Sequence, residues 1–399
     1  MNRLFGYELK KLLCRRMVWI SLVVSLLLCG VTVCAPLIGS YYVNGEAVST
    51  NYEEFQTDKA YQQVLDGRAI DEALIGEMQE AYAKVPMEVE QYSLTEEYQK
   101  YARPYSAIYH YVRLATGLPG KEAIRWVAGT ENLQEKRLQV QEKRWESYLL
   151  TEIEKDYWRA QEEKIEHPMV FRYVGAYSVL ISAVYTVGLV TIFVVSVCLA
   201  GIFPEEHVKR TDQLILSSKC GREKTYGAKF GAGILFAFGM SLIMGLFTMG
   251  LAFAVYGTEG FHGAFQLEYS GSSAAISVGE AVLIAYTMVL FAGVFMGALV
   301  MMLSEVLRSS VGTLAIATGI IVLPMFFSMP EEYRVLSQLW SYLPSDFVAV
   351  WSLFSPQMVV LGNIVLPAWQ AVPMLYMILG GVFAMVTKRV FVRYQVSGR

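Results

Sequence analysis

Long apolar runs alternate with polar segments along this chain, and each run has the length of a membrane-spanning helix. A helix needs about 20 apolar residues to cross roughly 30 Å of hydrocarbon. Six runs meet this condition: 17–39, 176–202, 231–256, 279–303, 311–329 and 371–387. A seventh, Phe347–Leu366, also lacks charge, but Pro356 interrupts it. We interpret the seventh as part of an external or re-entrant segment, 330–370, because a membrane tolerates broken helices where protein covers the backbone.

The polar segments around the first run predict two further units. Residues 1–16 place Leu4, Phe5, Leu9, Leu12 and Leu13 on one helical face, which predicts an amphipathic helix on the inner membrane surface with its lysines and arginines toward headgroups or a cytosolic partner. The first run, 17–39, also resembles a cleaved signal peptide, but the long helical start and Pro36 favour an uncleaved span.

Residues 40–172 form a long polar segment between the first and second runs. They contain none of the five cysteines, so no disulfide framework is expected there. Helical patterns occur around 59–84 and 96–114, and the run 131–166 has no Gly or Pro. At 1.5 Å per residue, that run allows one helix of ~50 Å. The segment is predicted to be a folded, mainly helical extracytoplasmic domain.

Composition and charge placement complete the expected architecture. The chain is 54% hydrophobic and only 17% charged, and its mean hydropathy is +0.38, which is typical of membrane proteins. Lys and Arg gather before 17, in the loop 203–230 and after 387, whereas 257–278 has none. Because basic loops stay in the cytoplasm, we expect a protein of the bacterial cytoplasmic membrane with both termini on the cytoplasmic side. The predicted fold is an all-α, multi-pass integral membrane protein in which 173–399 holds the second to sixth of six transmembrane helices.

Motifs for chemistry are missing from the sequence. It contains no GxxxxGK[ST] phosphate loop, no HExxH and no GxSxG, and its four histidines are widely separated. We therefore predict no catalytic residue, no metal site, no bound cofactor and no nucleic-acid partner. The runs also lack a central ionisable residue, which disfavours a secondary carrier because ion-driven carriers often bury such groups. Energy for transport is then expected to enter from the cytosol, through the loop 203–230.

The loop sequence EHVKRTDQLILSSKCGR, residues 206–222, followed by Lys229, resembles the signature of type 2 ABC exporter permeases. In that family the loop carries an acidic residue, Gly-Thr, two or three leucines, Ser-Thr-Pro, Ser-Arg and then a Lys. This chain departs from the signature, with Arg210 in place of the Gly, Lys219 in place of the Pro and Gly221 in place of the second Ser. The amphipathic start, the outer domain, the broken segment before the last run and the basic tail resemble the family too.

The resemblance implies a membrane subunit that pairs with a second permease half, as a homodimer or heterodimer, and with separate ATP-binding cassette ATPase subunits that bind ATP and Mg. We expect the loop to contact the ATPase through a short coupling helix. The residues expected to make this ATPase coupling are Glu206, Lys209, Arg210, Thr211, Leu214, Leu216, Ser217 and Arg222. The plainer interpretation is a topogenic loop that only keeps charge in the cytosol.

Two glycine steps predict close helix packing within the membrane, among lipids. Gly227 with Gly231, and Gly293 with Gly297, each form a GxxxG spacing that lets helix backbones approach. An alternative function is a membrane sensor or signalling protein whose extracytoplasmic domain binds a ligand. A lone ATP-binding cassette subunit as partner distinguishes a permease from a sensor.

Overall fold

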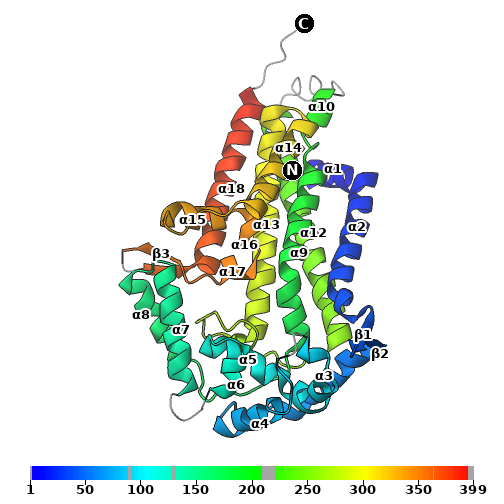
Figure 1. Cartoon of the computed structure of the whole chain (residues 1–399). Helices are drawn as coiled ribbons and strands as arrows, with labels where there is room; N and C mark the ends of the chain where they lie inside the picture. The colour runs from blue at the N-terminus through cyan, green and yellow to red at the C-terminus, as the bar shows by residue number, and fades with distance from the viewer. Residues whose placement is uncertain (1, 89–90, 127–131, 209–220, 363, 394–399) are drawn as a thin grey trace.

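The computed structural model describes residues 2–88, 91–126, 132–208, 221–362 and 364–393, and these are mainly helical. Among these described residues, five helices are long and apolar enough to cross a membrane: α2 (Arg16–Cys34), α9 (Gly175–Leu199), α12 (Gly221–Tyr256), α13 (Val278–Leu307) and α18 (Ala368–Arg393). A further apolar helix, α14 (Ser310–Phe326), is shorter. Figure 1 shows them as a bundle with a separate domain at one end. Each of the six predicted runs holds one of these helices.

α13 lies at the centre of the bundle and packs against α9, α12 and α18. Close approach is possible because of its glycines: a Cβ on Gly297 would lie 2.8 Å from the Cβ of Ala237 on α12, and one on Gly293 would lie 2.0 Å from Ser241 Oγ. The GxxxG step of Gly227 and Gly231 on α12 lacks such close contacts. A Cβ on Gly231 would lie 3.4 Å from the Phe5 ring, and one on Gly227 would meet nothing within 4 Å.

The segment 330–370 contains short elements instead of a seventh long helix. They are α15 (Arg334–Ser341), α16 (Pro344–Phe347), α17 (Val350–Leu353) and the antiparallel hairpin of β3 (Met358–Leu361) and β4 (Ile364–Pro367). The short helices lie against α9, where a Cβ on Gly188 would be 2.6 Å from Val348 Cβ and where the rings of Tyr185 and Trp351 are 5.1 Å apart. Gly188 is about halfway along α9, so this segment reaches deep into the bundle.

The separate domain is built from residues 40–172. It starts with the antiparallel hairpin of β1 (Ser40–Val43) and β2 (Glu46–Thr50) and continues with α3 (Asn51–Leu65), α4 (Glu72–Tyr82), α5 (Ser106–Thr116), α6 (Gly120–Arg125), α7 (Leu133–Ser147) and α8 (Glu152–Glu162). Short helical turns connect the elements: η1 (Ala35–Leu37), η2 (Tyr92–Leu94), η3 (Tyr98–Ala102) and η4 (Arg103–Tyr105), with η5 (Phe265–Leu267) between α12 and α13. Leu74, Met78, Ile108 and Val112 are fully buried in its core.

The single helix that the run 131–166 allows does not form, because the chain turns between α7 and α8. Leu149 adopts a left-handed backbone conformation with φ 53°. Thr151 and Glu154 then form a capping box that starts α8, satisfying backbone N–H groups at the new helix end. A Gly is not needed for this turn, since buried contacts of Leu150 and Glu154 hold it in place.

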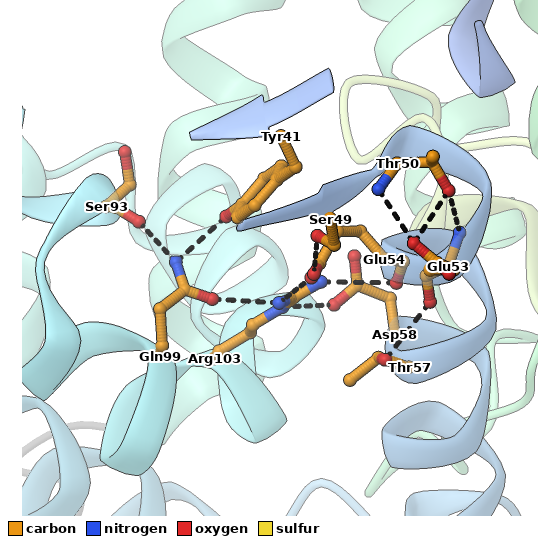
Figure 2. Close-up of polar contacts among 10 residues, drawn as sticks. All are labelled: Tyr41, Ser49, Thr50, Glu53, Glu54, Thr57, Asp58, Ser93, Gln99 and Arg103. Atoms are coloured by element: carbon orange, nitrogen blue, oxygen red, sulfur yellow. Dashed lines mark hydrogen bonds and ion pairs between the residues drawn. The ribbon is translucent and has the colours of Figure 1, made fainter. Parts of the chain in front are cut away.

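A buried arginine joins the hairpin side of the domain to its helices, as Figure 2 shows. Arg103 pairs with Glu54 and donates from Nε to Asp58 Oδ1 at 2.6 Å, both on α3. It also donates to Gln99 Oε1 at 2.8 Å, and Gln99 donates to the hydroxyl of Tyr41 on β1 at 2.8 Å. Only 8% of the Arg103 side chain is exposed, so these acceptors replace its water.

The domain contacts the loops of the helix bundle at two places. From α7, Arg137 donates to the carbonyl of Ser272 at 2.9 Å and Arg144 to that of Gly271 at 2.7 Å, both in the loop between α12 and α13. From α8, Glu154 accepts two bonds of 2.6 Å from Arg334 at the start of α15, and Trp158 donates to the carbonyl of Pro356 at 2.8 Å. Domain and bundle are therefore linked through both loops.

Candidate coupling site

The candidate site lies at the end of the bundle opposite the separate domain, where α1 (Asn2–Leu13) and α10 (Pro204–Val208) meet the start of α12 (Figure 1). The apolar face of α1 folds onto α12: Leu12 is 2% exposed, and Phe5 and Leu9 pack against the main core. α10 directly follows the end of α9. The sequence predicts the α1 helix over 1–16. Phe5, Leu9 and Leu12 of the apolar face predicted there are packed, whereas Leu13 is 40% exposed.

Five charged side chains from α1, the α1–α2 junction, α10 and α12 form what we call the ion-pair cluster: Lys11, Arg15, Glu205, Glu206 and Lys229. Glu206 is at its centre. Its Oε1 is 2.8 Å from Lys11 Nζ, and the same oxygen pairs with Lys229. Arg15 pairs with Glu205 and donates to the carbonyl of Cys198 at 3.4 Å.

Burial of its charges makes the ion-pair cluster restrict how α10 can move relative to its neighbours. Lys229 has no exposed surface, and Glu206 is 7% exposed. The Lys229 ammonium lies 5.4 Å from the centre of the Phe203 ring, a cation–π contact. Taking two charges out of water is costly, and only close opposite charge offsets that cost. Any movement that separates α10 from α1 or α12 therefore leaves a charge without its partner, so these three elements are held in one arrangement.

Of the residues predicted for ATPase coupling, the structure describes Glu206 and Arg222. Arg222 Nη1 donates to the carbonyl of Val392 at 3.0 Å, so it joins the start of α12 to the end of α18. The remaining six, Lys209, Arg210, Thr211, Leu214, Leu216 and Ser217, lie outside the described residues. Within the predicted loop, 203–230, the structure places α10 near the start and the first turns of α12 from Gly221 onward. The first turns of α12 carry charged residues, so their sequence resembles a loop, although they belong to the same helix as the apolar run that follows.

Sequence reasoning missed most of the ion-pair cluster. Lys11 and Arg15 were expected to face headgroups or a cytosolic partner, but they pair with Glu206 and Glu205. Glu205 and Lys229 were not among the predicted site residues. A usable signal exists, since Lys229 stands between Ala228 and Phe230 near the start of a long apolar run. A single basic residue there has to find an acid or remain unpaired in an apolar setting.

A comparison with protein-family models matches residues 3–359 to a family described as ABC-2 family transporter protein. That match covers most of the 399 residues. The chain belongs to the ABC-2 family. The resemblance to type 2 ABC permeases is thereby confirmed. The ABC-2 protein is a multi-pass membrane permease of an ABC transporter, a class of subunit that has no ATPase of its own and associates with ABC ATPases. A comparison with curated proteins finds no match.

Proposed function

We propose that this ABC-2 protein is the membrane-spanning permease subunit of an ATP-driven exporter and is driven by separate ATPase subunits through the loop 203–230. The observation that supports this most directly is the position of Glu206. It lies on α10, near the start of this loop, and pairs with Lys229, which lies near the end of the loop on α12, and with Lys11 on α1. ATP and Mg are bound by the partner in this proposal, and this chain binds no cofactor.

The ion-pair cluster suggests how a push on the loop is passed on. Glu206 links α10 to two helices at once, so a displacement of α10 moves α1 and α12 as rigid bodies. α12 has 36 residues, or about 54 Å at 1.5 Å per residue, and reaches the far end of the bundle. There Tyr256 donates to the carbonyl of Val33 on α2 at 2.9 Å, and its own carbonyl accepts from Lys59 of the separate domain at 3.3 Å.

Six crossings with both termini in the cytoplasm fit the arrangement best. α1 packs on the start of α12, and Arg222 bonds the end of α18 there, so both ends of the described chain lie at one end of the bundle. That requires an even number of crossings, and α14 supplies the sixth. Its 17 residues span about 26 Å, slightly less than a ~30 Å hydrocarbon core. The domain of residues 40–172 is then extracytoplasmic.

Lipids and a second permease half, identical or different, complete the proposed complex. Exposed apolar side chains on α2, such as Leu27 and Val31, and on α18, such as Met377 and Ile378, offer surface for both. The proposed location is the bacterial cytoplasmic membrane.

The test is to purify the tagged chain from its native membrane in mild detergent, identify what accompanies it by mass spectrometry, and measure ATPase activity. We expect an ATP-binding cassette subunit that is lost on Leu214→Asp, a change in the loop that leaves the ion-pair cluster intact. Glu206→Gln is expected to retain the bound ATPase subunit but to reduce the permease's stimulation of its ATP hydrolysis by at least about 10-fold. The matched control is Glu223→Gln, since the Glu223 side chain is 71% exposed and its pair with exposed Lys388 lies at the surface.

Recovery of the chain without any ATPase would contradict the proposed function and favour the sensor. Equal stimulation in wild-type protein and Glu206→Gln would retain the permease assignment but remove Glu206 from the coupling route.

A further inference from the structure

The separate domain contains a cavity of about 530 Å³ between α4, α5 and the start of α7. Its floor is apolar and buried. Ile75 of α4 is 2% exposed, Tyr111 of α5 is 3% exposed, and Trp126 is 9% exposed. A cavity of this size holds a group larger than one side chain, and aromatic walls favour a flat or branched apolar group.

The rim of the cavity is acidic. Asp71, Glu72 and Glu135 line it, and all three are exposed. Asp71 also caps α4 by accepting from the backbone N–H of Leu74 at 2.9 Å. No Lys or Arg is present among the lining residues that the structure describes. Negative charge around an apolar floor, with no positive charge among these lining residues, raises the local concentration of cations.

A buried acceptor adds a third feature. His167 lines the same cavity, and its Nε2 atom is buried without a hydrogen-bond partner. Burial and the nearby charge of Arg137 lower the pKa of His167, so the ring stays neutral at pH 7. Arg137 itself is paired with Glu162. A neutral ring adds no positive charge that would oppose the acidic rim.

We propose that this cavity binds a cationic amphipathic ligand, of the class of a peptide that carries guanidinium or amine groups beside apolar side chains. The apolar group occupies the floor formed by Ile75, Tyr111 and Trp126. The cation lies at the rim, near Glu72 and Glu135. This assignment goes beyond the proposed function, since it concerns binding outside the bundle and requires no ATPase.

The experiment uses the full chain in nanodiscs of phosphatidylcholine, a zwitterionic lipid without net charge, so that the lipid does not attract the cationic probe. The probe is a dye-labelled peptide of alternating arginine and leucine, and its binding is followed by fluorescence anisotropy. The control peptide has citrulline, which keeps the shape of arginine without its charge. We expect binding of the arginine peptide, no binding of the citrulline peptide, and roughly 10-fold weaker binding by Glu72→Gln with Glu135→Gln.

The matched control variant is Glu80→Gln with Glu163→Gln, because both residues are exposed on the same domain, are absent from the cavity lining and give the same change in net charge. It is expected to bind the arginine peptide like the unmodified chain. Equal weakening by both double variants, or equal binding of both peptides, would overturn the proposal. Thermal midpoints check that the variants are folded. The absence of an ATPase partner would contradict the proposed function and leave this result unaffected.

Discussion

Lys229 shows what a single charged residue does in this fold. It has no exposed surface, although the neighbouring Lys224 on the same helix is exposed. The difference lies in the acid that each can reach. Lys229 faces α10 and pairs with Glu206, whereas Lys224 faces solvent. A buried base of this kind holds its helix in place because moving away from the acid leaves the charge uncompensated.

Replacing Lys229 with Met is expected to destabilise the protein by about 3 kcal/mol, since it takes a basic partner away from the buried Glu206 carboxylate. Combining Lys229→Met with Glu206→Gln should cost less than the sum of the two single changes, because the buried negative charge is removed as well. Thermal unfolding in detergent measures both. The control, Lys224→Met, should change stability by less than about 0.5 kcal/mol. Additive costs would show that the two side chains act independently.

Glycines in the bundle differ by element, although their spacing in the sequence is the same. On α13, Gly297 lies against Ala237 of α12. On α12, Gly227 faces open space and Gly231 faces the flexible ring of Phe5. Only the α13 step therefore restricts how closely two long helices pack.

Ala substitution at the two kinds of glycine is expected to have opposite effects. Gly297→Ala places a Cβ 2.8 Å from Ala237 Cβ and should cost about 1–3 kcal/mol through overpacking. Gly227→Ala should stabilise by up to about 1 kcal/mol, because Ala favours the helix and nothing obstructs it. Adding Ala237→Gly to Gly297→Ala should recover part of the loss. Thermal midpoints of the three variants give the signs, and equal shifts at both glycines would contradict the packing argument.

At the scale of the whole molecule, the domain of residues 40–172 is tied to the bundle by polar contacts at two loops. Glu154 is central to one tie: it is fully buried, accepts from Arg334, from the backbone N–H of Met358 at 2.9 Å and from that of Thr151 at 2.8 Å. One carboxylate therefore caps α8 and connects it to both α15 and β3.

Glu154→Gln is expected to loosen this tie, since an amide offers one acceptor oxygen in place of two and carries no charge toward Arg334. Hydrogen exchange should increase in 148–162 and 355–358, while exchange in α13 stays unchanged. The control is Glu152→Gln on the same helix, whose side chain is 72% exposed. Equal exchange in the two variants would mean that Trp158 and the α7 contacts suffice to hold the domain.

Length and periodicity in the sequence are enough to predict the apolar helices, the amphipathic α1 and the position of the polar domain between the first and second apolar runs. Each depends on the periodicity or length of its own residues, and the structure has a helix in every predicted run. Tertiary structure decided what local pattern cannot contain. The turn at Leu149 depends on contacts of α8 with α15, and the split of 330–370 depends on α9 offering Gly188 to Val348. The pairing of Lys11 and Lys229 with Glu206 joins residues far apart in the chain. Charge alone identifies them as polar, but only packing takes Lys229 and Glu206 out of water and makes each require its partner.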